Sequence, residues 1–249
     1  MRRIVTILVV LAVAAFLFSG CGQEQSTIEK GKLLVGAYMD AGAPLSVMEG
    51  GKPVGYSVDL CNGIAERMGL ECEIVPTPVG DLIGGLNSER FDIIGSVMKM
   101  TPERIQEIDF SIPYLQVSDE IFVLKGSAIR SEADLAGKVV GTMAETATAK
   151  ELEELENLKD VKIFETDLLG LEALEKGEID AYIGYRHSTW DNIKKTGMEA
   201  EMVTEFGATI DLGIGVKKGN TELLNNVNKA LEEMQKDGTL EKLEKEWLE

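Results

Sequence analysis

Histidine, cysteine and aromatic residues are scarce in this 249-residue chain, which has one His, three Cys, two Trp, five Tyr and seven Phe. The single histidine, His187, excludes metal sites built from several histidines, and the HExxH, CxxC, GxSxG and P-loop patterns are missing. Among 43 acidic residues, some lie close together by chance, so no catalytic carboxylate pair can be assigned. We therefore expect no catalytic residues, no metal and no cofactor.

Basic residues are also few, with 25 Lys and Arg against 43 Asp and Glu and a formal net charge of −18. No basic cluster offsets this charge locally, which excludes nucleic acid as a partner because phosphate backbones would be repelled. The chain is 44% hydrophobic and 27% charged, so it can bury a core and is not a disordered segment. Its length suits one large domain or two small ones.

The longest apolar run lies at the N-terminus, from Ile4 to Phe18, and two arginines precede it. It is short for a membrane span, and the Ser-Gly-Cys that follows is typical of a lipoprotein signal. We expect residues 1–20 to be removed, Cys21 to be acylated as the mature N-terminus, and residues 21–29 to form a flexible tether. Such a protein is exported and anchored outside the cytoplasmic membrane or in the periplasm. An uncleaved anchor helix is the alternative.

Export permits a disulfide, and Cys61 and Cys72 are the cysteines left to form one. They lie early in a helical pattern and at the start of the next strand, which places their Cα atoms too far apart to bridge. We expect two buried thiols.

Short apolar runs alternate with amphipathic stretches along the chain, which predicts an α/β fold with parallel sheets covered by helices on both faces. The predicted strands are residues 32–37, 73–76, 93–97, 120–124, 139–142, 162–165, 181–184 and 213–216. The predicted helices are residues 57–68, 81–87, 147–155, 168–175, 189–195 and 222–236, the last one restarting after Gly238.

Six blocks carry a family resemblance that spans nearly the whole chain after the signal. They are GYSVDLCNGIAERMG (55–69), LIGGLNSERFDII (82–94), TPERIQEIDFSIPY (101–114), ADLAGKVVGTM (133–143), LEKGEIDAYIG (174–184) and VNKALEEMQKDGTLEKLEKEW (227–247). Together they resemble the family 3 solute-binding proteins of amino-acid ABC importers. TPER followed by DFSxPY is the most specific of these signals.

The resemblance implies a two-lobed clamshell of the type 2 periplasmic-binding-protein fold, with two hinge crossings and the ligand in the cleft. Lobe one would comprise residues 30–117 and 213–249, and lobe two residues 118–212. The implied protein is a monomer that captures an amino acid or a related small carboxylate by hinge closure and delivers it to ABC permease subunits. The alternatives are an exported lyase of the cyclohexadienyl dehydratase kind and a ligand-sensing input protein.

The same resemblance assigns Arg104 to the ligand's carboxylate, because a guanidinium can present two parallel donors. An ion pair with Glu103 or Glu107 is the alternative for this arginine. Ser96 and its neighbour Val97 are expected in the pocket. So is Thr146, for which ordinary helix capping is the alternative.

Several positions depart from the family pattern and change the expected charge of the pocket. Tyr185 stands where an Asp usually pairs with the ligand's α-ammonium, Tyr38 stands where binders of basic amino acids often carry an acid, and Lys99 replaces a small hydroxyl residue. An ammonium buried beside Lys99 and Arg104 without a carboxylate would cost several kcal/mol. These departures favour a ligand that is an acid without an α-amino group, or a dicarboxylate. Lys99 could instead extend to solvent.

The second interpretation is that Glu145, which stands where the family usually has Gly, replaces the missing Asp. Val79 stands where Trp or Phe is common, so the usual aromatic walls are reduced. Tyr38, Tyr185 or Trp190 could supply aromatic surface instead. His187 and the preceding arginine begin a helix near the cleft mouth and are expected to be exposed.

Overall fold

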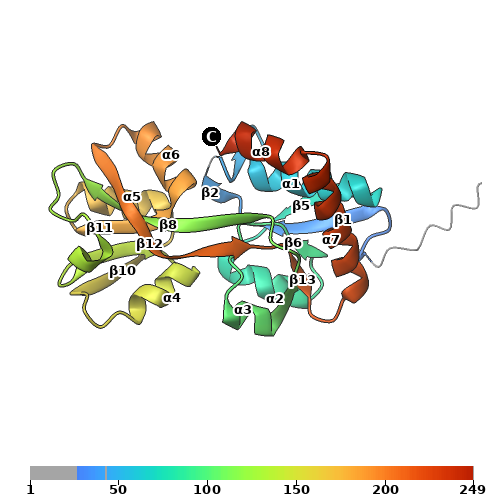
Figure 1. Cartoon of the computed structure of the whole chain (residues 1–249), viewed down its shortest axis with the longest axis horizontal. Coiled ribbons are helices and arrows are strands. Elements are labelled where there is room, and N and C mark those ends of the chain that lie inside the picture. Colours follow the sequence, from blue (N-terminus) through green and yellow to red (C-terminus); the bar gives the residue numbers. More distant parts are fainter. Residues whose placement is uncertain (1–26, 43, 249) are drawn as a thin grey trace, which may run out of the picture.

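The chain folds into two α/β lobes joined by a pair of long strands (Figure 1). This computed structural model describes residues 27–42 and 44–248, so the signal segment, the proposed lipidation at Cys21 and most of the tether lie outside the described residues. No helix within the described ranges is long and apolar enough to cross a membrane.

The first lobe is built on a five-stranded sheet in the order β5-β1-β6-β13-β7. These strands are β5 (Glu71–Pro76), β1 (Lys32–Ala37), β6 (Ile93–Ile94), β13 (Gly215–Lys217) and β7 (Ile108–Phe110). The helices of this lobe are α1 (Tyr56–Met68), α2 (Leu82–Asn87), α3 (Pro102–Glu107), α7 (Thr221–Lys236) and α8 (Thr239–Trp247). A small antiparallel sheet adds β2 (Asp40–Gly42), β3 (Ser46–Glu49) and β4 (Lys52–Val54).

The second lobe is built on another five-stranded sheet, in the order β10-β9-β11-β8-β12. These strands are β10 (Asp160–Phe164), β9 (Val139–Met143), β11 (Ala181–Tyr185), β8 (Leu115–Leu124) and β12 (Ala200–Leu212). Its helices are α4 (Ala147–Glu153), α5 (Asp167–Glu175) and α6 (Arg186–Thr196). Short 3-10 turns occur at Val79–Asp81 and Glu132–Leu135.

Both sheets are mixed, which corrects the expectation of parallel sheets. The strands that precede crossover helices pair in parallel, as β5-β1-β6 and β10-β9-β11 do. The strands that carry the chain back between the lobes pair antiparallel, with β13 between β6 and β7, and β8 between β11 and β12. A chain that leaves the first lobe and returns to it must reverse direction, and these antiparallel strands make that reversal.

The link between the lobes is the antiparallel pair β8 and β12, which lie side by side along the long axis of the molecule (Figure 1). Leu115 pairs with Leu212 at one end, and Leu124 pairs with Ala200 at the other. Two register shifts interrupt the ladder, one between Met202 and Glu205 and one between Phe206 and Ile210. The chain therefore crosses between lobes twice, as expected; the lobe boundaries themselves at residues 117/118 and 212/213 remain predictions.

Alternating side chains of β8 supply the two cores of the second lobe. Ile121 and Val123 pack on one face with Val140, and Phe122 packs on the other with Tyr182. In the first lobe, the apolar faces of α1, α7 and α8 cover one side of the sheet in a single larger core. Both cysteines are free thiols, as expected; Cys61 is buried there, whereas Cys72, which was expected to be buried, is half-buried.

Glycine at position 170 lets α5 lie directly on its sheet. A Cβ at Gly170 would overlap the ring of Tyr182, which is fully buried. Gly84, in α2, has open space where its Cβ would be. A substitution at Gly170 therefore tests close packing against the sheet, whereas the same substitution at Gly84 tests helix propensity alone.

We predict that Gly170→Ala lowers the free energy of unfolding by about 1–3 kcal/mol because the new methyl group overpacks the core. Gly84→Ala is the matched control, and its helix propensity should raise stability by up to about 1 kcal/mol. Urea unfolding of both variants measures the difference. Equal stability of the two variants would contradict the close contact between α5 and the sheet.

Candidate functional site

A cavity lies between the two lobes and takes its walls from both. Its lining includes Tyr38, Val79, Ser96, Val97 and Arg104 from the first lobe and Asp119, Thr142, Thr146, Asp167 and Tyr185 from the second. The cavity measures about 50 Å³, enough for a few water molecules. A larger molecule therefore enters only if the lobes separate or side chains move.

Arg104 brings a positive charge to this cavity from the short helix α3. Thr101 begins that helix, and its hydroxyl accepts a hydrogen bond from the Arg104 backbone N–H at 3.4 Å. One guanidinium nitrogen donates to the carbonyl of Lys99 at 3.2 Å. Burial lowers the pKa of this guanidinium below its usual value.

In the part of the chain that the structure describes, Arg104 forms no ion pair, so the expected alternative with Glu103 or Glu107 is wrong. A half-buried guanidinium without a carboxylate at the wall of a cavity is suited to an anionic ligand group.

The other predicted polar residues of the cavity also make contacts within the protein. Thr146 caps α4, accepting from the Ala149 backbone N–H at 3.1 Å and donating to the Met143 carbonyl at 2.9 Å. Capping and lining the cavity are thus compatible for this residue. Ser96 is buried, and its backbone carbonyl accepts a hydrogen bond from the Tyr114 hydroxyl.

Tyr185 joins the two lobes across the cavity. Its hydroxyl donates to the carbonyl of Val97 at 3.2 Å, and that carbonyl belongs to the first lobe. Tyr38 makes a similar crossing, with its hydroxyl 3.8 Å from the Met143 sulfur. Both tyrosines line the cavity, as predicted.

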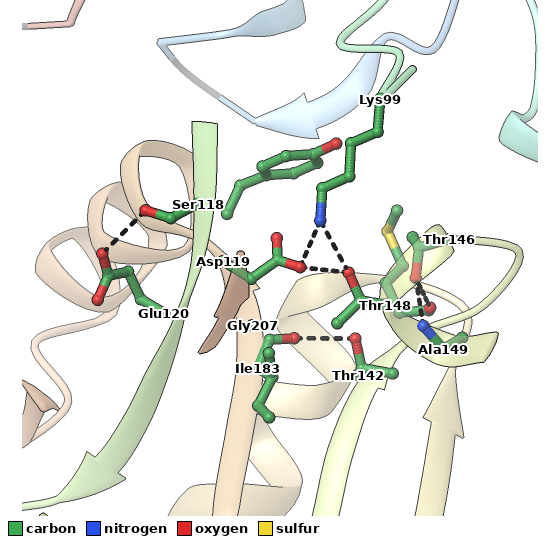
Figure 2. Close-up of polar contacts among 12 residues, drawn as sticks. Lys99, Ser118, Asp119, Glu120, Thr142, Thr146, Thr148, Ala149, Ile183 and Gly207 are labelled. Atoms are coloured by element: carbon green, nitrogen blue, oxygen red, sulfur yellow. Dashed lines mark hydrogen bonds and ion pairs between the residues drawn. The ribbon is translucent and has the colours of Figure 1, made fainter. Parts of the chain in front are cut away.

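Lys99 does not extend to solvent; its side chain is 4% exposed. The ammonium lies 2.5 Å from a carboxylate oxygen of Asp119 and 3.3 Å from the Thr148 hydroxyl, which itself donates to the same carboxylate (Figure 2). The ring centroid of Tyr185 is 5.2 Å from the ammonium. Lys99 therefore contacts groups that line the cavity while its own charge is already paired.

The inference that the pocket lacks a carboxylate is wrong. Asp119 on β8 and Asp167 at the start of α5 both line the cavity. Sequence reasoning assigned neither. Two signals could have indicated them: charged residues inside the otherwise apolar β8 strand, and an aspartate directly after Thr166, which caps α5.

Ionisation of Asp167 lowers the stability of the folded protein. Its carboxylate accepts a hydrogen bond from the Tyr182 hydroxyl at 2.5 Å, but burial dominates and raises its pKa from 3.8 to about 6. Groups with pKa values displaced by burial are concentrated at functional sites. The residue therefore offers a negative charge that the protein alone does not fully compensate.

Glu145 lies beside the inner cavity and does not line it. Its carboxylate accepts a hydrogen bond from the backbone N–H of Gly80 in the first lobe at 3.0 Å, and its φ of 59° is in the left-handed region. Glu145 lines a second cavity of about 640 Å³, which shares Arg104 and Thr146 with the inner cavity. Glu145 thus contacts the first lobe beside the inner cavity and does not line it.

The remaining residues named from the sequence lie outside the cavity. Arg186 pairs with Glu120 at 2.5 Å, and together with His187 it lines a neighbouring cavity of about 190 Å³. Both residues are half-buried, so the expectation that they are exposed is wrong. Burial and the adjacent arginine lower the pKa of His187. Trp190 stacks on Phe122 in the core of the second lobe, with ring centroids 6.4 Å apart. Among the described residues, no group of three or more His, Cys, Asp or Glu could hold a metal ion.

We predict that Asp167→Asn stabilises the protein at pH 7 by about 1–3 kcal/mol, because it removes an ionised group whose folded pKa is raised. The folded state favours the protonated form, so the stability lost to ionisation is largest above pH 6 and fades as the pH falls toward 4. The advantage of the variant should therefore shrink by about 2 kcal/mol between pH 7 and pH 4.5. Urea unfolding at both pH values measures it, with the exposed Asp81→Asn as control. A pH-independent difference would contradict the assigned cause.

Comparisons with known proteins agree with this architecture. The L-cystine-binding protein TcyJ of Escherichia coli K12 is 32% identical over 92% of this chain and 87% of that protein. A solved structure of an ancestral arginine-binding protein bound to arginine has a TM-score of 0.82 at 32% identity and covers 88% of this chain and 99% of that one.

A third similar protein is the ancestral amino acid-binding protein AncCDT-1, described as a precursor of cyclohexadienyl dehydratase. Its structure has a TM-score of 0.78 at 33% identity and covers 88% of this chain and 96% of that one. Residues 34–249 match the sequence family described as bacterial extracellular solute-binding proteins, family 3. The chain therefore belongs to the family 3 extracellular solute-binding proteins.

Proposed function

We propose that this protein is the substrate-binding component of an ABC uptake importer, which captures a small carboxylate by closing its lobes and delivers it to a membrane permease. Family membership supports the transport role. The observation that carries the carboxylate is Arg104, a guanidinium without an ion-pair partner among the described residues, at the wall of the interlobe cavity.

The ligand that best balances the charges of the cavity is an α-amino acid. The sequence departures favoured an acid without an α-amino group, on the premise that the pocket lacks a carboxylate. Asp167 removes that premise, since it faces the same cavity as Arg104. A zwitterion would place its carboxylate on Arg104 and its ammonium on Asp167, and neither buried charge would remain uncompensated. Among the similar proteins, amino-acid binders predominate by name.

Hinge closure provides the affinity, because the proposed contacts come from both lobes. Ser96 and Arg104 lie on the first lobe, and Thr146, Asp167 and Tyr185 on the second. Only a closed form presents all of them to one ligand. Shifting an equilibrium from 1:99 to 99:1 requires about 5.5 kcal/mol of such differential binding.

The N-terminal segment completes the proposal. Export with acylation at Cys21 would hold a monomeric binding protein at the outer side of the cytoplasmic membrane or in the periplasm, close to its permease. The strength of the anchor depends on the number of acyl chains.

An exported lyase is the second candidate, because AncCDT-1 is named as a precursor of a dehydratase. The raised pKa of Asp167 would suit a general acid. We nevertheless propose binding without chemistry, since Asp119, the other carboxylate at the cavity, is already paired with Lys99. Turnover of a cyclohexadienyl acid by the purified protein would decide for the lyase.

We predict that Arg104→Lys weakens ligand binding about 10- to 100-fold, because a lysine cannot form two parallel hydrogen bonds to a carboxylate. Arg130→Lys, on the exposed surface of the second lobe, is the matched control and should leave binding unchanged. Isothermal titration of the mature, unlipidated protein measures both. Equal ligand affinities of the two variants would show that Arg104 does not bind the ligand's carboxylate.

We also predict that an L-α-amino acid stabilises the protein more than the 2-oxo acid or the amine with the same side chain. A thermal-shift screen of such trios measures this, since a ligand at 100 times its Kd adds about 2.7 kcal/mol of stability. Asp167→Asn should reduce the advantage of the amino acid over the oxo acid, and Glu145→Gln should not. A greater stabilisation by the oxo acids would support a ligand without an amino group. If Glu145→Gln abolishes the advantage of the amino acid over the oxo acid, the ligand's ammonium binds Glu145.

A further inference from the structure

Lys99 reaches from one lobe into the other. Its backbone belongs to the first lobe, where its carbonyl accepts a hydrogen bond from Arg104, and it bridges to Leu212 at the end of the connecting strand β12. Every contact described above for its ammonium is made by the second lobe, through Asp119, Thr148 and Tyr185. Figure 2 shows the lysine pointing down onto the aspartate and the threonine.

These three groups are what a primary ammonium requires in a buried site. A carboxylate balances the charge, a hydroxyl accepts a second hydrogen bond, and an aromatic face lies within about 6 Å. The Thr148 hydroxyl also donates to Asp119, which fixes the carboxylate in position. Asp119 is 3% exposed and Thr148 is 4% exposed, so with the lobes closed these groups are shielded from water.

We propose that Asp119, Thr148 and Tyr185 form an ammonium-binding subsite in the second lobe, and that Lys99 fills it in cis. The lysine then acts as a tethered ligand that draws the lobes together before any solute binds. It also excludes a solute's ammonium from Asp119 and leaves Asp167 as the available carboxylate.

A purely structural ion pair would show the same distances, so the two interpretations must be separated by whether a free ammonium can take the place of the lysine. Lys99→Ala removes three methylene groups and the ammonium, which together correspond to n-propylammonium. The experiment therefore adds n-propylammonium chloride to the mature, unlipidated variant. It measures the melting temperature and the radius of gyration by small-angle X-ray scattering.

We expect Lys99→Ala to lower the melting temperature by about 6–15 °C, since it leaves Asp119 buried without its partner. Saturating n-propylammonium should restore at least half of that loss and reduce the radius of gyration. It should have no such effect on the wild-type protein, on the double variant Lys99→Ala/Asp119→Asn, or when 1-propanol replaces it.

Equal effects of n-propylammonium on Lys99→Ala and on the double variant would overturn the subsite. If Lys99→Ala does not fold in buffer alone, its refolding is measured in n-propylammonium chloride and in 1-propanol: refolding only in n-propylammonium supports the subsite, and failure to refold in both overturns it. Neither arm uses the transported solute, so failure here leaves the amino-acid proposal to be judged by its own titrations.

Discussion

Each charge that is buried when the two lobes meet needs a partner of opposite charge, because an unpaired buried charge is costly. This constraint determines how the groups of the site are arranged. Lys99 and Asp119 balance each other across the interface, with both side chains less than 5% exposed. Arg104 and Asp167 face the same cavity without such a partner, one a cation and the other a carboxylate with a raised pKa. A zwitterionic ligand completes the balance that the protein leaves open.

The strands that connect the lobes run past the cavity, and they bring Lys99 and Asp119 together. Asp119 lies on β8, one of the two connecting strands, and Lys99 bridges to the end of the other, β12. Arg104 and Asp167 lie on the first turns of α3 and α5, helices whose starts are fixed by the threonine caps Thr101 and Thr166. Rotation about the connecting strands would therefore move Arg104 away from Asp119 and Asp167.

Elements with a strong apolar pattern could be predicted from the sequence. Strand β1 and helix α1 were predicted to within one residue, and the break between α7 and α8 at Gly238 is confirmed. Strand β12 was missed because only Ala200, Phe206 and Leu212 are buried along its 13 residues, so no apolar run marks it. Its pairing with β8 makes it a strand, and such pairing cannot be read locally.

The candidate site was predicted in part for a similar reason. Family resemblance indicated Arg104, Tyr38 and Tyr185, and all three line the cavity. It could not indicate that Lys99 would meet Asp119, 20 positions away, because that contact depends on how the two lobes close. The family pattern has its carboxylate at the position of Tyr185, and the sequence offered Glu145 as a replacement. The structure places Asp119 and Asp167 at the cavity instead.

The most direct test is a crystal structure of the mature protein with the amino acid that stabilises it most. We expect the ligand's carboxylate to accept two hydrogen bonds from Arg104 and its ammonium to lie within about 3 Å of Asp167, with Lys99 still paired to Asp119. A ligand ammonium bound to Asp119, with Lys99 displaced from it, would contradict this account of the site.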